Sequence, residues 1–397
     1  MTSSRIPGFY KLSPKERLDI IAEFSGISEE ERRFLEKSYL TTEQADKMVE
    51  NVVGSFPIPL GFAANFLING KDYIIPMATE EPSVIAAASN AAKISRVRGG
   101  IKSEATTPVM IGQIHLSGVS NQDEAEEKIL SEKDNIIETC NSCDSTLVSL
   151  GGGAKGLEIR KLGKTMVVHL LVDCRDAMGA NAVNTMAERI APLLEELSGG
   201  KAVLRILSNL AVHRLVKSSA VFDKEELGGE EIVDAIVDVS EIAKTDIYRA
   251  STHNKGVMNG ISALVLATGN DTRAVEAGVH SYAGKGESYI PVTSFSKNSE
   301  GDLVGELEVP MAVGIVGGAT KIHPVAKTNL KVLGISSAAE LAEIAGAVGL
   351  CQNFAALKAL TSEGIQKGHM KLHARKIESE KMGTSSGLNN SDPNEKL

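Results

Sequence analysis

The chain has 397 residues, of which 42% are hydrophobic and 23% are charged, and its formal net charge is −9. This composition is typical of a globular protein long enough for two domains, or for one large domain that carries an insertion. Tryptophan is absent, and the other aromatic residues are nine phenylalanines and six tyrosines. Because a nucleic-acid-binding surface combines basic residues with aromatic side chains, we expect no nucleic acid as a partner.

Membrane and secretion signals are not evident in the sequence. The longest apolar stretch that we identify, residues 309–320, is short and broken by glycines, whereas a membrane span needs about 20 apolar residues. The N-terminus lacks the apolar region of a signal peptide. The four cysteines are few for a disulfide framework, and we interpret Cys140 and Cys143 as reduced thiols rather than half of a zinc site. These features predict a cytoplasmic protein that binds no membrane.

The N-terminal third is expected to be helical and then to form a hairpin. Residues 13–50 have a polar helical pattern, with helix starts at Ser28 and at Thr41. An Asn-Gly pair at Asn69 and Gly70 lies between two apolar stretches, which strongly favours a β-hairpin.

The stretch "PMATEEPSVIAAASNAAK" contains an acid pair, Glu80 and Glu81, immediately before Pro82. Proline suits the first position of a helix, and acidic residues suit the positive end of the helix dipole. The helix that follows consists mostly of small residues, so a ligand or a second backbone can approach it closely. This stretch alone is therefore consistent both with an ordinary helix start and with a binding site.

Between residues 107 and 212 the pattern changes to that of a small inserted domain. Its predicted elements are a strand at 108–119, a helix at 121–143, strands at 156–162 and 164–174, a helix at 181–200 and a strand at 201–209. This order is that of a ferredoxin-like unit. The glycines Gly151, Gly153 and Gly156 match the letters of a dinucleotide fingerprint, but a strand follows them instead of a helix, so we predict a turn and no Rossmann domain.

The residues "VDCRDAMGANAVNTMAE" (172–188) run from a strand through a polar turn into a helix. Backbone N–H groups at a helix start bind phosphate well, and Asp176, Gly179 and Asn181 line that turn. A capped helix start without a ligand is an equally good interpretation of this stretch alone.

Two further stretches hold candidate catalytic groups. Lys255 lies in a segment rich in Gly and Asn, and Asp271 follows an apolar run that resembles a strand. A buried lysine beside carboxylates can stabilise a developing oxyanion and separate the pKa values of the acids; an ordinary surface charge and a helix cap are the alternatives. His369 and His373 are spaced i, i+4, but no third metal ligand is evident, so we expect no metal and keep His369 only as a candidate acid.

Taken together, the motifs closely resemble those of the soluble, class II form of 3-hydroxy-3-methylglutaryl-CoA (HMG-CoA) reductase. The matching stretches follow one another from about residue 5 to 375: "ENVVGSFPIPLG", "EEPSVIAAASNAAK", "DAMGANAVNTMAE", "RILSNLA", "THNKGVMNG", "TGNDTRAVEAG", "VGGATKIHP" and "EGIQKGHMKLHAR". The resemblance implies an α+β fold: a large helical substrate-binding domain (1–106 and 213–366), an inserted ferredoxin-like cofactor-binding domain (107–212), and a truncated flap with a disordered tail (367–397).

The resemblance also implies the reaction, which is the reduction of (S)-HMG-CoA to (R)-mevalonate and CoA in isoprenoid biosynthesis, with two hydrides from a nicotinamide cofactor. Glu81 would be the catalytic acid, Lys255 would stabilise the oxyanion, Asp271 would tune the acid, and His369 would protonate the CoA thiolate. The substrate would be held by Ser83, Asn209 and Arg249. The cofactor would be held by Asp176, Met178, Gly179 and Asn181.

Asp144 matches the position at which NAD-preferring relatives carry an aspartate on the adenosine ribose. A carboxylate accepts a hydrogen bond from a 2′-hydroxyl and repels a 2′-phosphate, so NADH is expected in preference to NADPH. The resemblance implies at least a homodimer with active sites at the subunit interface. Oxidative mevalonate catabolism, or a CoA-binding protein that lost catalysis with its flap, are the alternative functions, because only 24 residues follow His373.

Overall fold

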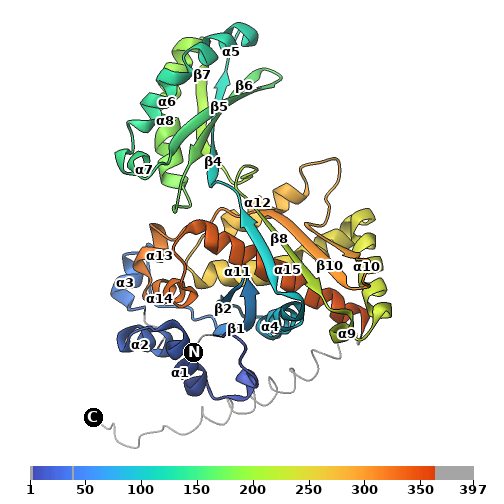
Figure 1. The fold of residues 1–397 in the computed structure, drawn as a ribbon. Coiled ribbons are helices and arrows are strands. Elements are labelled where there is room, and N and C mark those ends of the chain that lie inside the picture. The colour runs from blue at the N-terminus through green and yellow to red at the C-terminus, as the bar shows by residue number, and fades with distance from the viewer. Residues whose placement is uncertain (1–2, 38–39, 363–397) are drawn as a thin grey trace, which may run out of the picture.

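The computed structural model describes residues 3–37 and 40–362. The predicted flap and tail at 367–397, and with them His369, lie outside these ranges. The described residues form two sheets, each with its own hydrophobic core. In Figure 1 the two sheets belong to separate parts of the molecule, which we call the small lobe (109–208) and the large lobe (the other described residues).

The large lobe is built on a six-stranded sheet in the order β2-β1-β3-β8-β10-β9. Its strands are β1 (Leu60–Ile68), β2 (Lys71–Ala78), β3 (Ile101–Ala105), β8 (Leu215–Phe222), β9 (Thr293–Lys297) and β10 (Leu303–Pro310). β1 and β3 run parallel, and the other neighbours are antiparallel. The predicted hairpin is confirmed, because β1 and β2 join through Asn69 and Gly70, whose φ values of 49° and 78° suit this residue pair.

Helix α15 (Ala338–Thr361) runs through the centre of the large lobe and contacts β3, β8 and β10 on one side and α4 (Val84–Ser95) and α11 (Ile247–Ala267) on the other (Figure 1). By length and composition α15 could span a membrane, so our statement that no stretch is long enough was wrong. The helix is apolar because it is a core element: 67% of its most apolar window is buried within the protein.

Other helices complete the large lobe. They are α1 (Pro14–Ser25), α2 (Glu29–Lys37), α3 (Thr42–Asp46), α9 (Lys224–Leu227), α10 (Glu230–Thr245), α12 (Thr272–Ala283), α13 (Gly318–Ile322) and α14 (Pro324–Leu333), with short 3-10 turns η1 (Phe9–Lys11) and η2 (Arg96–Arg98). The predicted helix starts at Ser28 and Thr41 are confirmed. Each side chain accepts a hydrogen bond from the backbone of the residue three positions on, and that residue's side chain bonds back.

The small lobe has the strand order β5-β6-β4-β7, all antiparallel, which is the ferredoxin-like arrangement predicted from the sequence. Its strands are β4 (Val109–Ser117), β5 (Gly153–Leu162), β6 (Thr165–Asp173) and β7 (Lys201–Ser208). Its helices are α5 (Gln122–Ser131), α6 (Lys133–Asn141), α7 (Ser145–Ser149) and α8 (Ala180–Ser198). The single helix predicted over 121–143 was wrong: Glu132, at φ −96° and ψ 12°, separates α5 from α6.

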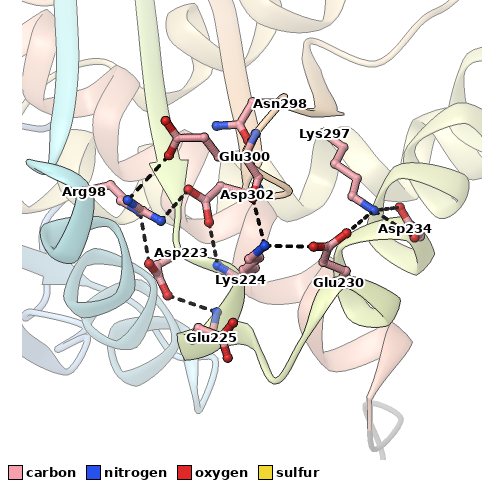
Figure 2. Close-up of polar contacts among 10 residues, drawn as sticks. All are labelled: Arg98, Asp223, Lys224, Glu225, Glu230, Asp234, Lys297, Asn298, Glu300 and Asp302. Atoms are coloured by element: carbon pink, nitrogen blue, oxygen red, sulfur yellow. Dashed lines mark hydrogen bonds and ion pairs between the residues drawn. The ribbon is translucent and has the colours of Figure 1, made fainter.

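A network of ion pairs fixes one end of the six-stranded sheet (Figure 2). Arg98 of η2 binds Asp302 at 2.8 Å and Asp223 at 3.0 Å. Lys224 binds Glu230 at 2.8 Å, and Lys297 forms ion pairs with both Glu230 and the exposed acid Asp234. The Asp302 side chain is almost completely buried, and its charge is balanced there by Arg98. This network joins η2, α9 and α10 to the hairpin between β9 and β10.

Candidate functional site

A cavity of about 290 Å³ lies where the end of β2 meets α11 and α12. It is lined by Ala78, Thr79, Glu80, Glu81, Lys255, Met258, Asn259, Ser262, Ala263, Leu266, Thr272, Glu276 and His280. A larger hollow of about 930 Å³ lies on the face of the six-stranded sheet around Lys102, Lys217 and Glu306, but none of the site residues predicted from the sequence lines it. The smaller cavity is therefore the candidate active site.

Glu81 and Lys255 come from distant parts of the chain and meet in this cavity. The Lys255 ammonium Nζ lies 2.7 Å from Glu81 Oε2, and the other carboxylate oxygen, Oε1, accepts a hydrogen bond of 3.2 Å from the Asn259 amide. The sequence analysis missed Asn259. Its spacing of four residues from Lys255 on one helix was the signal that could have identified it.

The exposure of Lys255 differs from the expectation. Its side chain is 59% exposed in the single chain, and Glu81 is 37% exposed, so the prediction of a buried lysine was wrong for the isolated subunit. The reason is that α11 presents this face at the mouth of the cavity, whereas the residues that face α15, such as Val257 and Ile261, are fully buried.

The chain reaches α4 through an unusual turn. The helix begins at Val84, and Ser83 is its N-cap at φ 76°, a left-handed conformation that is rare for serine. Pro82 therefore precedes the helix and is not its first residue, which corrects that part of the prediction. The Ser83 side chain makes no capping hydrogen bond to the helix, and Ser83 is not among the residues that line the cavity. Strained residues of this kind occur often at functional sites.

Besides Glu80 and Glu81, a third carboxylate, Glu276 of α12, lines the same cavity, and it was also missed by the sequence analysis. It accepts hydrogen bonds from the Ser262 hydroxyl and from His280 Nε2, the latter at 3.0 Å. Burial alone would raise the pKa of Glu276, but the hydrogen bonds from His280 and Ser262 outweigh burial and lower it. The cavity thus contains a carboxylate held in its charged form.

Asp271 stands at the edge of the cavity. It caps α12 by accepting a hydrogen bond from the Ala274 backbone at 3.0 Å, and its neighbour Thr272, not Asp271 itself, lines the cavity. The apolar run before it is the end of α11 and not a strand, so that part of the interpretation was wrong. The structure brings Glu81 and Lys255 together and leaves Asp271 outside their direct contact.

The predicted substrate residues Ser83, Asn209 and Arg249 lie on different elements, and none of the three lines the cavity. Arg249 is in the first turns of α11, and burial lowers its pKa while Asp246 opposes this shift. Asn209 precedes β8, and its backbone carbonyl lies so close to Gly278 of α12 that a Cβ there would approach it to 2.7 Å.

The turn between β6 and α8 contains the predicted cofactor residues. Gly179 is the N-cap of α8 at φ 106° without a side-chain cap, and a Cβ there would approach Cys174 Sγ to 2.3 Å. Met178 is partly buried, and Asn181 is exposed in the first turn of α8. The Asp176 carboxylate already has an intramolecular partner, since its Oδ1 accepts a hydrogen bond of 2.8 Å from the Ala338 backbone at the start of α15.

Asp144 is the N-cap of α7 and accepts a hydrogen bond of 2.8 Å from the Leu147 backbone. Gly151, at φ 85°, lies in a turn as predicted, but Gly153, at φ 95°, begins β5 and Gly156 lies within it, so the predicted turn is shorter than expected. Gly152 lies between Leu147 and Arg175, since a Cβ there would approach each of these side chains within 3 Å. Asp144 thus lies on the side of the small lobe that carries the turn before α8.

The cysteines are all free thiols. Burial raises the pKa of Cys140 and of Cys174, to about 12 and about 11 respectively, so neither is a thiolate at neutral pH. Within residues 3–37 and 40–362, no group of three or more His, Cys, Asp or Glu side chains is arranged to hold a metal ion.

Comparison with known proteins gives a consistent set of relatives. Residues 13–374 match the family described as hydroxymethylglutaryl-coenzyme A reductase. The chain is 56% identical to the 3-hydroxy-3-methylglutaryl-coenzyme A reductase of Archaeoglobus fulgidus over 379 residues, which are 94% of this chain and 87% of that protein. It is 37% identical to a probable reductase of the same name from Borreliella burgdorferi, covering 83% of this chain and 77% of that one.

A similar solved structure is that of the class II 3-hydroxy-3-methylglutaryl-CoA reductase from Streptococcus pneumoniae bound to NADPH in open conformations. The two structures align with a TM-score of 0.87 and 42% sequence identity, covering 90% of this chain and 99% of that one.

Proposed function

Because this chain belongs to the hydroxymethylglutaryl-coenzyme A reductase family, we propose that it reduces (S)-HMG-CoA to (R)-mevalonate and CoA with two equivalents of NAD(P)H. The family resemblance inferred from the sequence motifs is confirmed. The direction and details of the reaction are our proposal. The observation that supports them best is the contact of 2.7 Å between Lys255 and Glu81 in one cavity.

In the proposed reaction, Lys255 binds the thioester carbonyl oxygen and stabilises the negative charge that develops when hydride reaches the carbonyl carbon. A bound nicotinamide cofactor supplies this hydride. The resulting hemithioacetal then releases CoA as a thiolate. A free thiol has a pKa of about 8.5 and a free imidazolium one near 6.5, so an imidazolium protonates a thiolate readily. We assign this role to His369.

The second reduction converts the aldehyde to the alcohol. Glu81 in its protonated form donates the proton to the oxygen and becomes a carboxylate. Lys255 and the Asn259 amide then hold this carboxylate, as their hydrogen bonds to both of its oxygens support. Asp271 tunes the acidity of Glu81 from the start of α12, a role that requires it to come closer to the pair when ligands bind.

Ser83, Asn209 and Arg249 are proposed to hold the acyl part of the substrate. Ser83 is favoured because it lies two residues from Glu81 and its side chain makes no capping hydrogen bond to α4. Arg249 supplies a cation that can pair with the carboxylate of the substrate, and it lies less than two turns before Lys255 on α11.

The cofactor is proposed to bind at the start of α8 through Asp176, Met178, Gly179 and Asn181. The uncapped helix start fits this role, because its free N–H groups can bind phosphate oxygens. We retain the proposal that NADH is preferred, on the basis of the Asp144 charge, with NADPH as the alternative; the Streptococcus pneumoniae relative is described as bound to NADPH.

We also propose a homodimer whose active sites lie at the subunit interface. The segment before β1 is strongly apolar and exposed, with Val53 99% and Phe56 91% exposed. Tyr248, at the start of the helix that carries Lys255, is 85% exposed. A second copy would cover these apolar groups and exclude water from Lys255.

Isoprenoid biosynthesis in the cytoplasm is the proposed setting, with oxidative mevalonate breakdown by NAD as the second candidate. The proposal is tested by mixing the purified chain with NADH and HMG-CoA and measuring both NADH oxidation and mevalonate. We expect two NADH consumed per mevalonate formed. Retained CoA binding without NADH oxidation above background, with either cofactor, would instead support a protein that has lost catalysis.

A further inference from the structure

Arg214, which precedes β8, is a buried arginine between the two lobes. It is only 4% exposed, and its guanidinium donates to three backbone carbonyls. Nη1 binds the carbonyls of Ala177 at 3.1 Å and Met178 at 3.0 Å, in the turn proposed to hold the cofactor. Nη2 binds the carbonyl of Val313 in the large lobe at 2.5 Å. One side chain therefore joins the cofactor turn to the large lobe.

Residues 313–316, which come after β10, pack directly against the backbone of the cofactor turn. A Cβ at Gly314 would approach the Met178 backbone nitrogen to 2.5 Å, so only glycine fits there. The Ile315 backbone donates to the Asp176 carbonyl at 2.9 Å, and Ala177 forms a parallel bridge with Val316. The turn before α8 and residues 313–316 are thus held as one backbone unit.

The same unit reaches the catalytic cavity. The Gly314 backbone donates to Asn270 Oδ1 at 2.7 Å, and the Asn270 amide donates in turn to the Thr268 hydroxyl. Asn270 directly precedes Asp271, the cap of α12, and Thr272, which lines the cavity. Hydrogen bonds and the chain itself therefore connect Met178, through Arg214 and residues 313–314, to Asn270, which directly precedes the cap of α12.

Arg214 is a charged side chain that binds backbone carbonyls and forms no ion pair with the described carboxylates. Among the described residues no carboxylate lies within ion-pair distance of it, and the acceptors that it uses are backbone carbonyls. Burial lowers its pKa to about 10, while Cys174, Asp173 and Asp176 oppose this shift, so it stays charged at neutral pH. A planar guanidinium can hold carbonyls of two segments at once in a fixed geometry, which a lysine ammonium cannot do equally well.

We infer that Arg214 is a positioning residue for hydride transfer. It fixes the position of the cofactor turn in the small lobe relative to the start of α12 and the Glu81–Lys255 pair. This inference rests on the proposed function. Arg214 touches neither substrate nor cofactor in this account, and it acts through the backbone of Ala177, Met178 and Val313. A residue with only a structural role would affect stability without affecting the hydride step.

The test compares Arg214→Ala and Arg214→Lys with Arg98→Ala, which removes an arginine of the ion-pair network in Figure 2, and no residue of that network lines the cavity. Each variant is assayed as the full chain with HMG-CoA and with NADH or NADH deuterated at the transferred position. Free guanidinium ion is added as a probe that can occupy the space left by the side chain.

For Arg214→Ala we expect a loss of about 100-fold in kcat/KM for NADH, because misplacing reacting groups by about 1 Å costs that much. The deuterium isotope effect should rise above that of the wild type, since hydride transfer becomes the slow step, and guanidinium should restore part of the rate. Arg214→Lys should lie between the wild type and alanine. Arg98→Ala should show none of these changes at a temperature where it is folded.

An unchanged isotope effect in Arg214→Ala would overturn the inference. So would a loss of kcat/KM that is proportional to the loss of thermal stability in both Arg214→Ala and Arg98→Ala. Failure of the proposed function is distinguishable, because the wild type would then turn over no HMG-CoA. In that case NADH affinity, measured by calorimetry, decides: weaker binding in Arg214→Ala alone supports the positioning role, and equal binding in all variants contradicts it.

Discussion

The ammonium of Lys255 lies 2.7 Å from the carboxylate of Glu81, although 174 residues separate the two in the chain. The side chains are 59% and 37% exposed, so this ion pair contributes little to stability, about 0–1 kcal/mol. A charge pair that stabilises the fold so little, at the mouth of a cavity, is better explained by chemistry than by folding.

Replacing Lys255 with methionine should therefore remove activity and leave the fold intact. We expect the turnover of HMG-CoA to fall about 10²- to 10³-fold, the effect of losing one donor to a developing oxyanion. Lys128→Met is the matched control, because Lys128 is also exposed and also forms a 2.7 Å ion pair, with Glu124 on α5. Steady-state rates and thermal melts of both variants provide the measurement; an active Lys255→Met enzyme would refute the role given to this lysine.

Asn259 should contribute to the same step. Asn259→Ala removes the amide that donates to Glu81 Oε1, and a hydrogen bond to a charged group is worth enough to predict a 10- to 100-fold lower kcat. Asn135→Ala is the control, since Asn135 donates similarly to Glu132 on the surface of the small lobe at 3.1 Å. If both variants retained wild-type kcat, Asn259 would have no part in holding the acid.

Asp144 should determine the choice of cofactor. Asp144→Asn keeps an oxygen that can cap α7 at Leu147 but removes the negative charge. We expect the ratio of kcat/KM for NADPH to that for NADH to rise about tenfold, which corresponds to roughly 1.4 kcal/mol of relieved repulsion. An unchanged ratio, or a wild type that already prefers NADPH, would show that Asp144 does not set the preference.

Arg98 should be a stability residue without a catalytic role. Arg98→Met leaves the buried Asp302 carboxylate without its charged partner, although the Lys224 backbone N–H still donates to it at 3.0 Å. Because Arg98 is itself 37% exposed, we expect a loss of about 1–3 kcal/mol in unfolding free energy. Lys244→Ala, which breaks an exposed pair with Glu241, should cost less than 1 kcal/mol. Urea unfolding measures both, and equal losses would contradict the special role of the buried acid.

His253 should make the protein sensitive to acid. The residue is 1% exposed, Nε2 bonds the Thr293 hydroxyl, and Nδ1 has no hydrogen-bond partner within residues 3–37 and 40–362. Burial, helped by the charge of Arg249, lowers its pKa to about 4. Because an unfolded histidine has a pKa near 6.5, the unfolded state binds the extra proton first, and stability falls as the pH decreases from 6.5 towards 4.

The expected loss from His253 at pH 5 is about 2 kcal/mol relative to pH 7.5. His253→Gln, which can still donate to Thr293, should reduce the pH dependence of the unfolding free energy by about that amount. Identical pH dependence in the two proteins would mean that other groups cause the acid sensitivity.

Local signals accounted for much of the fold. The hairpin at Asn69 and Gly70 and the helix starts at Ser28 and Thr41 depend on neighbouring residues, so the sequence predicted them correctly. The ferredoxin-like order also followed from the alternation of patterns along the chain. The end of α11 resembled a strand because it is apolar on several sides, and only its packing against α15 explains this.

The site was predicted less completely, because its contacts join distant residues. Glu81 and Lys255 were candidates from the local sequence and received their roles through family resemblance, but no local pattern indicates that they touch. Asn259 and Glu276 were missed because their roles depend on which faces of α11 and α12 meet. Likewise, the exposure of Lys255 reflects how α11 is oriented, and a Gly- and Asn-rich segment does not reveal that.

The most direct test of the whole account is a crystal structure of the chain with HMG-CoA and the oxidised cofactor bound together. We predict that Lys255 Nζ lies within hydrogen-bond distance of the thioester oxygen, with Glu81 beside it and the nicotinamide ring facing the same carbonyl carbon. A thioester bound elsewhere, or one that contacts neither Lys255 nor Glu81, would contradict the proposed mechanism.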